Sequence, residues 1–422
     1  MIIKSLKSEQ RSDRQRVSAQ VVWEDCERQD GEIYFETDVS FAEALTCNPH
    51  SFLVACAVPA MHYGEKRISI DAEICPELRD GLLTALRWIK HWQYPPSKLL
   101  PRIEAKTRSN VSTSSFNERA GMFFSGGIDA FSSLRSNRLN VPATHPLSIK
   151  DGLLVYGFEI YEPRIFKLVF QSFSKISEKI GITLIPVYTN IYLNFRQEDT
   201  ANKFDFWAYE FMGAAFAAIA HAFTRRLNVI TLASNADIPH LEPFGSHPLV
   251  DVNYSSMDLR IRHDGILLSR LDKTSLVADW AIALDNLRVC NLIKQYRPGM
   301  LNCGQCPKCI KTMLTLLAIG KLKQSHAFPA RDVSPEQILK FAQIYDAYTE
   351  SSYRELIPLL ANRGRHDLVK AIESKISSYH NPAVSWKRRA WQFDNRYLNG
   401  SLRRLKAYMG GKAKILSGGR PS

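Results

Sequence analysis

The stretch GMFFSGGIDAFSSL, residues 121–134, combines residue types that could bind an anion. Apolar residues typical of a buried strand lead into Ser125, Gly126 and Gly127, and a helical pattern begins directly after them. A helix N-terminus presents unpaired N–H groups and a partial positive charge, and glycines let the backbone approach an anion without a Cβ in the way. The Ser125 hydroxyl could add a hydrogen bond. The stretch therefore predicts a phosphate-binding turn, with an ordinary tight turn as the alternative.

Two familiar nucleotide-binding motifs do not match this stretch. A Walker A loop would continue with Gly-Lys and then Ser or Thr, and no such run follows Gly127. The dinucleotide-binding pattern G-x-G-x-x-G does not fit either, because the two glycines are adjacent. The usual triphosphate-hydrolase loop and the dinucleotide-binding turn are therefore excluded here.

Four cysteines late in the sequence could bind a metal ion. They are Cys290, Cys303, Cys306 and Cys309, and the last three form C-x2-C-x2-C. Four thiolates suit tetrahedral zinc, and the short spacings let successive thiolates converge on one ion through a tight turn. Because four cysteines leave no open coordination position, we expect a structural zinc. An iron–sulfur cluster is the alternative, although a ferredoxin run would continue with x3-Cys-Pro. Unliganded thiols are the third interpretation.

The segments around these motifs alternate between strand and helix patterns. From residue 119 on, apolar strand candidates are followed by longer stretches with helical spacing of apolar residues. Strands that alternate with helices of this length predict an α/β fold with a parallel sheet covered on both faces. The predicted strands are 120–125, 152–160, 182–188 and 228–234, and the predicted helices are 128–137, 164–181, 205–226 and 272–287.

We divide the chain into three regions. Residues 1–112 are expected to form an α+β domain of unknown role, because they contain two alternating strand patterns and one helical pattern. The stretch 94–118, rich in Pro, Ser and Thr, is interpreted as a linker or extended connection to an α/β region at 113–322. Residues 323–422 are expected to be helical and basic, and they include a capping box that starts at Ser334.

The 422-residue chain is basic, with a formal net charge of +13. Such a charge favours acidic partners such as nucleotides, RNA or an anionic surface. Much of it lies from Trp386 on, in a stretch that is either a solvated tail or a contact for nucleic acid or a partner protein. The apolar stretch 206–223 carries Glu210 and His221, so we interpret it as a buried helix and expect no membrane span. No signal-peptide pattern is visible, which predicts a cytoplasmic protein.

The turn at Ser125 resembles the pyrophosphate-binding PP-loop, S-G-G-x-D-S, of the ATP pyrophosphatases. The residues that match this pattern are Ser125, Gly126, Gly127 and Asp129. The resemblance implies a fold of the HUP or adenine-nucleotide α-hydrolase-like type, in which the loop and the N–H of Ile128 hold the phosphates of ATP. Ala130 stands where the family usually has serine. That departure leaves open the loss of one phosphate contact or a reduced activity.

The turn and the cysteines together resemble the 7-cyano-7-deazaguanine synthase family. Its members combine a PP-loop with a late C…C-G-x-C-P-x-C pattern, and this chain has that pattern at 290–309. The family binds zinc with four cysteines and turns a 7-deazaguanine carboxylate into an amide and then a nitrile, using ATP and ammonia. The resemblance covers roughly residues 119–315, so the chain is similar to a member with added regions at both ends.

The resemblance also implies a substrate pocket. The stretch 232–251 resembles the family segment V-N-A-x-D-Y-x-G-Y-P-D, which shapes that pocket. The implied substrate residues are Asn235, Asp237, Gly245, His247 and Asp251. His247 lies directly before Pro248, and from the sequence it is a general base, a substrate donor or a residue that packs the loop.

Further residues are implied for ATP. The stretch 269–280 resembles the family's T-K-x-E-I segment, which makes Lys273 a candidate phosphate contact beside Ser125 and Asp129. We expect Mg²⁺ near Asp129. The family's adenosine pocket lies at the end of the second strand, where this chain has Phe158 and Glu159.

The resemblance implies an ATP-dependent ligase. It would adenylylate a substrate, a carboxylate or a 7-deazapurine, release pyrophosphate, and let ammonia or an amine displace AMP. ATP, Mg²⁺ and Zn²⁺ would be its cofactors. Two alternatives stay open: a PP-loop enzyme that modifies tRNA or another RNA, and a non-catalytic nucleotide-binding subunit with a degenerate loop. A homodimer is one expectation for the assembly.

Overall fold

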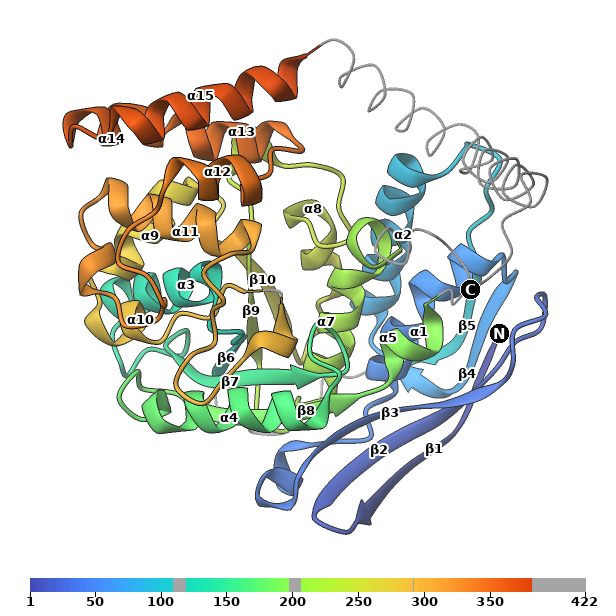
Figure 1. Cartoon of the computed structure of the whole chain (residues 1–422). Helices are drawn as coiled ribbons and strands as arrows, with labels where there is room; N and C mark the ends of the chain where they lie inside the picture. The colour runs from blue at the N-terminus through green and yellow to red at the C-terminus, as the bar shows by residue number, and fades with distance from the viewer. Residues whose placement is uncertain (109–118, 197–205, 291, 382–422) are drawn as a thin grey trace, which may run out of the picture.

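The structure is a computed structural model, and it describes residues 1–108, 119–196, 206–290 and 292–381. Its centre is a sheet in the spatial order β10-β9-β6-β7-β8-β3-β2-β1-β4-β5 (Figure 1). The strands are β1 Ile2–Arg11, β2 Arg14–Val22, β3 Gly31–Asp38, β4 Arg67–Ile74, β5 Arg102–Thr107, β6 Ala120–Phe123, β7 Ile149–Tyr156, β8 Thr183–Thr189, β9 Val229–Ala233 and β10 Arg260–Asp264.

One half of the sheet is parallel, as the alternation of strands and helices predicts. The strands β10, β9, β6, β7 and β8 all pair in parallel. In chain order the strands first run from β6 outward to β8, and the chain then returns so that β9 pairs on the other side of β6. Such a reversal opens a crevice at the carboxyl ends of the two strands beside it, which is where open α/β sheets bind ligands.

The other half of the sheet comes from the N-terminal region. Strand β3 pairs antiparallel with β8, with Phe35 opposite Thr189, so the sheet is continuous across the boundary proposed near residue 112. Strand β5 pairs in parallel with β4 at the far edge. The interpretation of 94–118 as a linker was therefore wrong for Arg102–Thr107, which forms a strand paired with β4. The division into domains itself stays a prediction.

Helices cover both faces of the parallel half, as predicted. Neighbouring residues of β7 show the two faces, because Leu153 belongs to one apolar core and Leu154 to the other. The first core includes α1 Pro49–Tyr63, α2 Pro76–Gln93 and α7 Met212–Ala222, and the second includes α3 Ile128–Asn140, α4 Pro163–Ser177, α9 Arg270–Ala278, α10 Ala281–Asp285 and α11 Pro307–Ala318.

The described C-terminal part is helical, as expected. Ser334 and Gln337 form the predicted capping box at the start of α12. Four described helices follow η6 (Leu322–Gln324), of which α12 and α14 pack on α11, and α15 packs on α12 and α14 (Figure 1). They are α12 Pro335–Phe341, α13 Ala347–Arg354, α14 Leu356–Asn362 and α15 His366–His380. The basic stretch from Trp386 on lies outside the described residues.

Short elements complete the chain, and two of them differ from the sequence prediction. The predicted helix 205–226 contains a π-helical turn, η2, at Trp207–Phe211. Residues 235–264, for which the sequence predicts neither a strand nor a helix, contain α8 and end in β10. The other short elements are η1 Val39–Ala44, α5 Ile191–Phe195, η3 Ile238–His240, α8 Pro248–Asp251, η4 Val252–Tyr254, η5 Ile293–Gln295 and η6 Leu322–Gln324.

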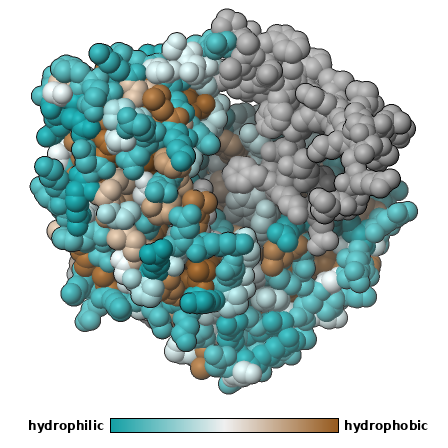
Figure 2. Space-filling model, in the orientation of Figure 1, coloured by the Kyte–Doolittle hydropathy of each residue, from teal (hydrophilic) through white to brown (hydrophobic). Residues whose placement is uncertain are grey.

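The face of the molecule seen in Figure 2 is mostly hydrophilic, and its hydrophobic residues lie in separate small groups. Single exposed apolar residues such as Leu267 are ordinary on a protein surface. Within the described ranges, no helix combines the length and the apolar character that crossing a membrane requires.

Candidate functional site

The Ser-Gly-Gly turn follows β6 at the point where the strand order reverses. Gly126 has a φ of +74°, and a Cβ at this position would lie 1.9 Å from Cζ of Phe173. Gly127 is the N-cap of α3 with a φ of −79°, and its Cβ would lie 3.4 Å from the Ser125 hydroxyl oxygen. The fold therefore requires glycine at 126, whereas 127 has ordinary space for a side chain. The Gly127 N–H donates to Ser125 Oγ over 3.3 Å.

Two basic side chains from the start of α9 reach the first turn of α3. Arg270 Nη1 lies 3.2 Å from Asp129 Oδ1, and Lys273 Nζ lies 3.8 Å from the same oxygen. Lys273 is 1% exposed and donates to the Ser234 carbonyl over 2.8 Å, at the carboxyl end of β9. Burial lowers the pKa of Lys273. The predicted residues Asp129 and Lys273 thus lie together, and Arg270 joins them.

Residues of α11 and of the C-terminal helices also lie near Arg270 and Asp129. Lys311 of α11 lies with Nζ 5.3 Å from the centre of the Tyr348 ring, which comes from α13. Burial and the charge of Arg270 lower the pKa of Lys311 to about 7. Arg270 and Tyr348 also interact with each other, and Arg270 Nε and Tyr348 Oη are both buried. Lys311, Arg270 and Tyr348 therefore form one buried polar group beside Asp129.

The predicted adenosine residues differ in exposure. Glu159 is exposed, and its carboxylate lies 3.8 Å from Arg288 Nη2. Phe158 is buried and packs on Trp207 and Phe216, with ring centres 4.7 and 5.3 Å apart. Glu159 can therefore face a ligand, whereas Phe158 fills the core under the end of β7.

The predicted substrate residues fall into two groups. Asn235 is exposed just after β9, and Asp237 pairs with Nδ1 of His240 over 2.5 Å. His240 also lies beside Tyr348, with ring centres 5.8 Å apart. Asn235 and Asp237 follow the carboxyl end of β9. Ser234, whose carbonyl accepts a hydrogen bond from Lys273, lies at the same end of this strand.

The second group packs against α7 and α2. The Gly245 N–H donates to the Ala208 carbonyl of η2. His247 Nδ1 accepts from the Leu249 N–H at the start of α8, and its ring packs on Trp92 at 4.9 Å. Of the three roles considered for His247, these contacts match loop packing.

Asp251 is fully buried in the same group. One of its oxygens, Oδ2, accepts from Ser246 Oγ over 2.7 Å and lies 2.7 Å from His263 Nδ1. A Cβ on Gly213 would lie 2.2 Å from Asp251 Oδ1, so α7 needs glycine there to admit the carboxylate. Asp251 thereby holds α8 against β10.

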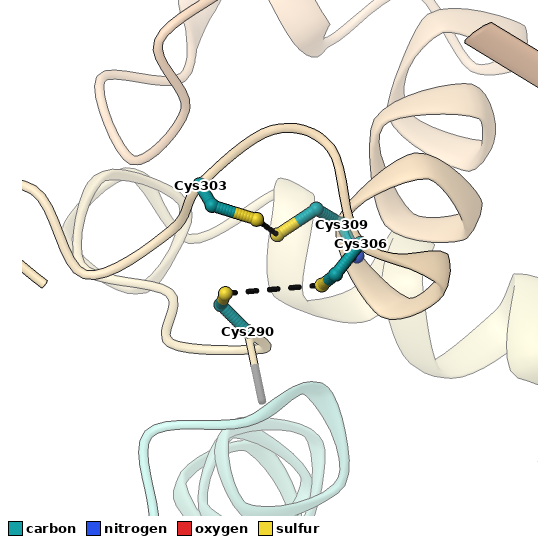
Figure 3. Close-up of side chains that lie close together, drawn as sticks. All are labelled: Cys290, Cys303, Cys306 and Cys309. Atoms are coloured by element: carbon teal, nitrogen blue, oxygen red, sulfur yellow. Dashed lines mark hydrogen bonds between the residues drawn. The ribbon is translucent and has the colours of Figure 1, made fainter. Parts of the chain in front are cut away.

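The four late cysteines converge in space. Figure 3 shows Cys306 and Cys309 at the start of α11, Cys303 in the loop before it, and Cys290 opposite them. The Sγ atoms of Cys290 and Cys306 are 3.8 Å apart, those of Cys303 and Cys309 are 3.9 Å apart, and all four lie within 4.8 Å of one another. A tetrahedral ion bound at about 2.3 Å places its sulfurs about 3.8 Å apart. The cluster could therefore hold a metal ion such as zinc.

The surroundings of the thiols also suit a cation. The backbone N–H groups of Leu292, Gln305 and Cys309 donate to cysteine sulfurs at 3.3 to 3.4 Å. A hydrogen bond with the neighbouring thiol of Cys306 raises the pKa of Cys290 to about 12. A bound cation favours the thiolate forms.

Four residues of the site were missed in the sequence: Arg270, Arg288, Lys311 and Tyr348. Arg270 and Lys311 lie two or three positions from motif residues, which was a weak signal. Comparison of the chain with protein-family models, with curated proteins and with solved structures finds no match in any of the three.

Proposed function

We propose that this protein is an ATP-dependent enzyme that adenylylates its substrate and releases pyrophosphate. One observation carries the proposal: the glycine turn at the reversal of the strand order is followed two residues later by Asp129, which Arg270 and Lys273 approach, with Lys311 close by. The N-terminus of α3 adds a partial positive charge and free N–H groups at the same place. Positive groups held in a buried site stabilise a departing polyphosphate better than they would in water.

The chain's own residues divide the work as follows. Ser125 and the N–H groups of Gly126 and Gly127 bind the β- and γ-phosphates, and Lys273 and Arg270 stabilise the charge that develops on pyrophosphate. A substrate carboxylate oxygen forms a bond to the α-phosphorus while the bond to pyrophosphate breaks. An amine or ammonia then forms a bond to the substrate carbon, and AMP leaves.

Two metal ions belong to the proposal. Asp129, two residues after the turn, would hold the Mg²⁺ that accompanies ATP, and that ion would screen phosphate charge. Asp129 already pairs with Arg270, so it would share its oxygens between the two. We assign zinc to the four cysteines on their Sγ separations, with a structural role because all four positions are filled by protein.

Product analysis tests the proposal. The protein is incubated with ATP, Mg²⁺ and a panel of carboxylic acids that includes 7-deazaguanine carboxylates, and the nucleotides and phosphates formed are measured. We expect AMP and pyrophosphate in equal amounts. Ser125→Ala should lower their formation by roughly 100-fold, since it removes one donor to the developing charge. Ser174→Ala, on the exposed side of α4, is the matched control. Formation of ADP and phosphate alone contradicts the proposal.

A nucleotide-binding protein without turnover is the second candidate, and position 130 favours it. Ala130 is 4% exposed and packs in the core, and Ser132 and Ser133 are also buried. A buried methyl group therefore stands at position 130, where the PP-loop pattern has a serine hydroxyl. This candidate predicts that ATP binds without pyrophosphate release. If the missing hydroxyl limits turnover, Ala130→Ser should gain pyrophosphate release. Pyrophosphate release by the wild type contradicts the candidate.

A further inference from the structure

We infer that Arg288 is a positioning residue that couples the four-cysteine site to the Ser125–Gly127 turn. Through it, binding of a metal by the cysteines regulates how the turn presents its N–H groups to an anion. The inference rests on the proposed function in one respect, because it takes the turn to be the anion site. The coupling itself is argued from contacts on both sides of Arg288.

On the side of the turn, Arg288 holds two successive carbonyl groups. Its backbone N–H donates to the Gly126 carbonyl over 2.7 Å, and its Nη1 donates to the Ser125 carbonyl over 3.1 Å. The side chain is 5% exposed, so water competes little for these bonds. Bonds from a charged donor in such a place are about twice as strong as neutral ones.

These two bonds fix the direction of the N–H groups that would bind an anion. A peptide unit is planar and trans, so its C=O and N–H point in opposite directions. The Ser125 carbonyl shares a plane with the Gly126 N–H, and the Gly126 carbonyl shares one with the Gly127 N–H. With both carbonyls turned toward Arg288, both N–H groups must point away from it. Loss of these bonds would leave glycine peptides free to rotate.

On the side of the cysteines, a hydrogen-bonded frame connects Arg288 to Cys290. Arg288 Nε donates to the Tyr296 hydroxyl over 3.0 Å, and that hydroxyl donates to the Cys290 carbonyl. Asn302 accepts from the backbone N–H groups of Val289 and Cys290 and donates to the carbonyls of Leu287 and Ala327. The frame is buried, and it connects Cys290 to the Ser125–Gly127 turn through hydrogen bonds with little freedom of rotation.

Metal binding should act on this frame directly. One bound ion can hold four cysteine sulfurs that lie within 4.8 Å of one another, whereas without it they are held by hydrogen bonds of 3.3 to 3.9 Å to N–H groups and to one another, which are weaker than metal–sulfur bonds. A displacement of Cys290 moves a residue only two positions from Arg288, and Tyr296 and Asn302 transmit it. A bound ion instead fixes Cys290 and keeps both carbonyls of the turn in place.

The test compares three variants with the wild type as the full chain. Arg288→Gln removes the charged fork, Arg288→Lys keeps the charge without the fork, and Tyr296→Phe removes only the bridging hydroxyl. Arg138→Gln is the matched control, because Arg138 also donates to backbone carbonyls, at Ile149 and Gly181, but has no contact with the turn. The readouts are zinc content, amide exchange of Gly126 and Gly127, and the Kd for inorganic pyrophosphate.

We expect Arg288→Gln to keep one zinc per chain while pyrophosphate binds at least tenfold more weakly. The Gly126 amide, whose peptide carries the Ser125 carbonyl, should exchange at least tenfold faster, and the Gly127 amide should change less because the backbone N–H of residue 288 still holds its peptide. Tyr296→Phe should show the same changes at smaller size, and Arg288→Lys should lie between wild type and Arg288→Gln. Arg138→Gln should lower the midpoint of unfolding without changing the turn. Amides of β2 serve as an internal control for global unfolding.

Removal of the metal with a chelator, from wild type and from Arg288→Gln, completes a double-perturbation cycle. Wild type should lose at least tenfold in pyrophosphate affinity, and Arg288→Gln should lose little more, because the two changes act through one route. Equal losses in both proteins, or unchanged glycine exchange on metal removal, overturn the coupling. If zinc-loaded wild type binds no pyrophosphate, the proposed function fails, and the exchange of the glycine amides on metal removal still decides the coupling.

Discussion

The two glycines of the turn are glycine for different reasons. At Gly126 the positive φ and the ring of Phe173 both exclude a side chain. At Gly127 neither constraint applies, because its φ is −79° and an added Cβ would make only ordinary contacts. A glycine that the fold does not need is explained if something must approach its backbone closely.

Alanine substitutions at Gly126 and Gly127 distinguish a glycine required by the fold from one required by a ligand. Gly126→Ala should lower the free energy of unfolding by about 2–4 kcal/mol, since it combines backbone strain with a collision in a packed core. Gly127→Ala should stay within about 0.5 kcal/mol of wild type but weaken pyrophosphate binding. Urea denaturation and titration calorimetry measure the two effects. Equal loss of stability in both variants would contradict the distinction.

At the same scale, the sequence revealed residues that belong to local motifs and missed those that only the fold brings in. Ser125, Asp129 and the four cysteines have readable spacings, and Lys273 was found through the family resemblance. Arg288 is 163 residues from Ser125, whose carbonyl accepts its hydrogen bond, and no local sequence pattern predicts such a contact. Tyr348 was missed because it belongs to a region outside the resemblance.

Among the elements, α1 and α7 meet through a buried pair of histidines. The rings of His50 and His221 are 5.4 Å apart, and both residues are at most 2% exposed. His50 Nε2 accepts from the Cys75 N–H, and His221 Nε2 lies 2.8 Å from the Tyr254 carbonyl. Burial lowers the pKa of His50 to about 2 and that of His221 to about 4.

This pair predicts that acid weakens the packing of α1 on α7. Both folded pKa values lie below the ordinary value, so the unfolded chain binds more protons and stability falls as the pH drops below about 6.5. At pH 5 each histidine should cost about 2 kcal/mol relative to neutral pH. Urea denaturation between pH 7.5 and 5 measures the slope. His221→Gln should flatten it, and the exposed His326→Gln should not; an unchanged slope in His221→Gln would refute the assignment.

Helices and strands with a clear apolar periodicity are the elements that a sequence predicts well. Segments with clear periodicity, such as α2, α4 and α15, were found because their apolar residues follow a helical spacing. Strand β5 was read as linker because prolines precede it and charges alternate along it. Strand β10 was missed because four of its five residues are polar. The π-helical turn depends on packing and has no sequence pattern that we could use.

At the scale of the whole molecule, one apolar core joins the two halves of the sheet. It contains Ile33 and Phe35 of β3 together with Phe211, Ile230 and Ile261 from the parallel half. Hydrogen bonds of Thr37 to the Pro186 carbonyl and of Thr189 to the Tyr34 carbonyl add to the short β3–β8 ladder. These contacts predict that the halves unfold together.

Phe35→Ala tests that prediction. Phe35 is fully buried beside Phe52, and truncation of such a ring costs about 3–5 kcal/mol. If the halves form one cooperative unit, amides of β2 and of β9 should both exchange faster in the variant, by similar factors. Ser8→Ala, on an exposed part of β1, is the control. Faster exchange in β2 alone would mean that the N-terminal region unfolds by itself, as the predicted boundary near 112 implies.

The outer edge of the sheet limits how copies of this protein can assemble. Strand β5 presents alternating charges at Arg102, Glu104 and Lys106. Glu104 pairs with Arg102 and with Arg67 of β4, and Lys106 pairs with Asp71 of β4. Charges along an edge strand oppose the addition of another strand, and the opposite edge, β10, is only five residues long. A pair of chains would therefore have to meet through helices or loops, and extension of the sheet into a fibre is disfavoured at both ends.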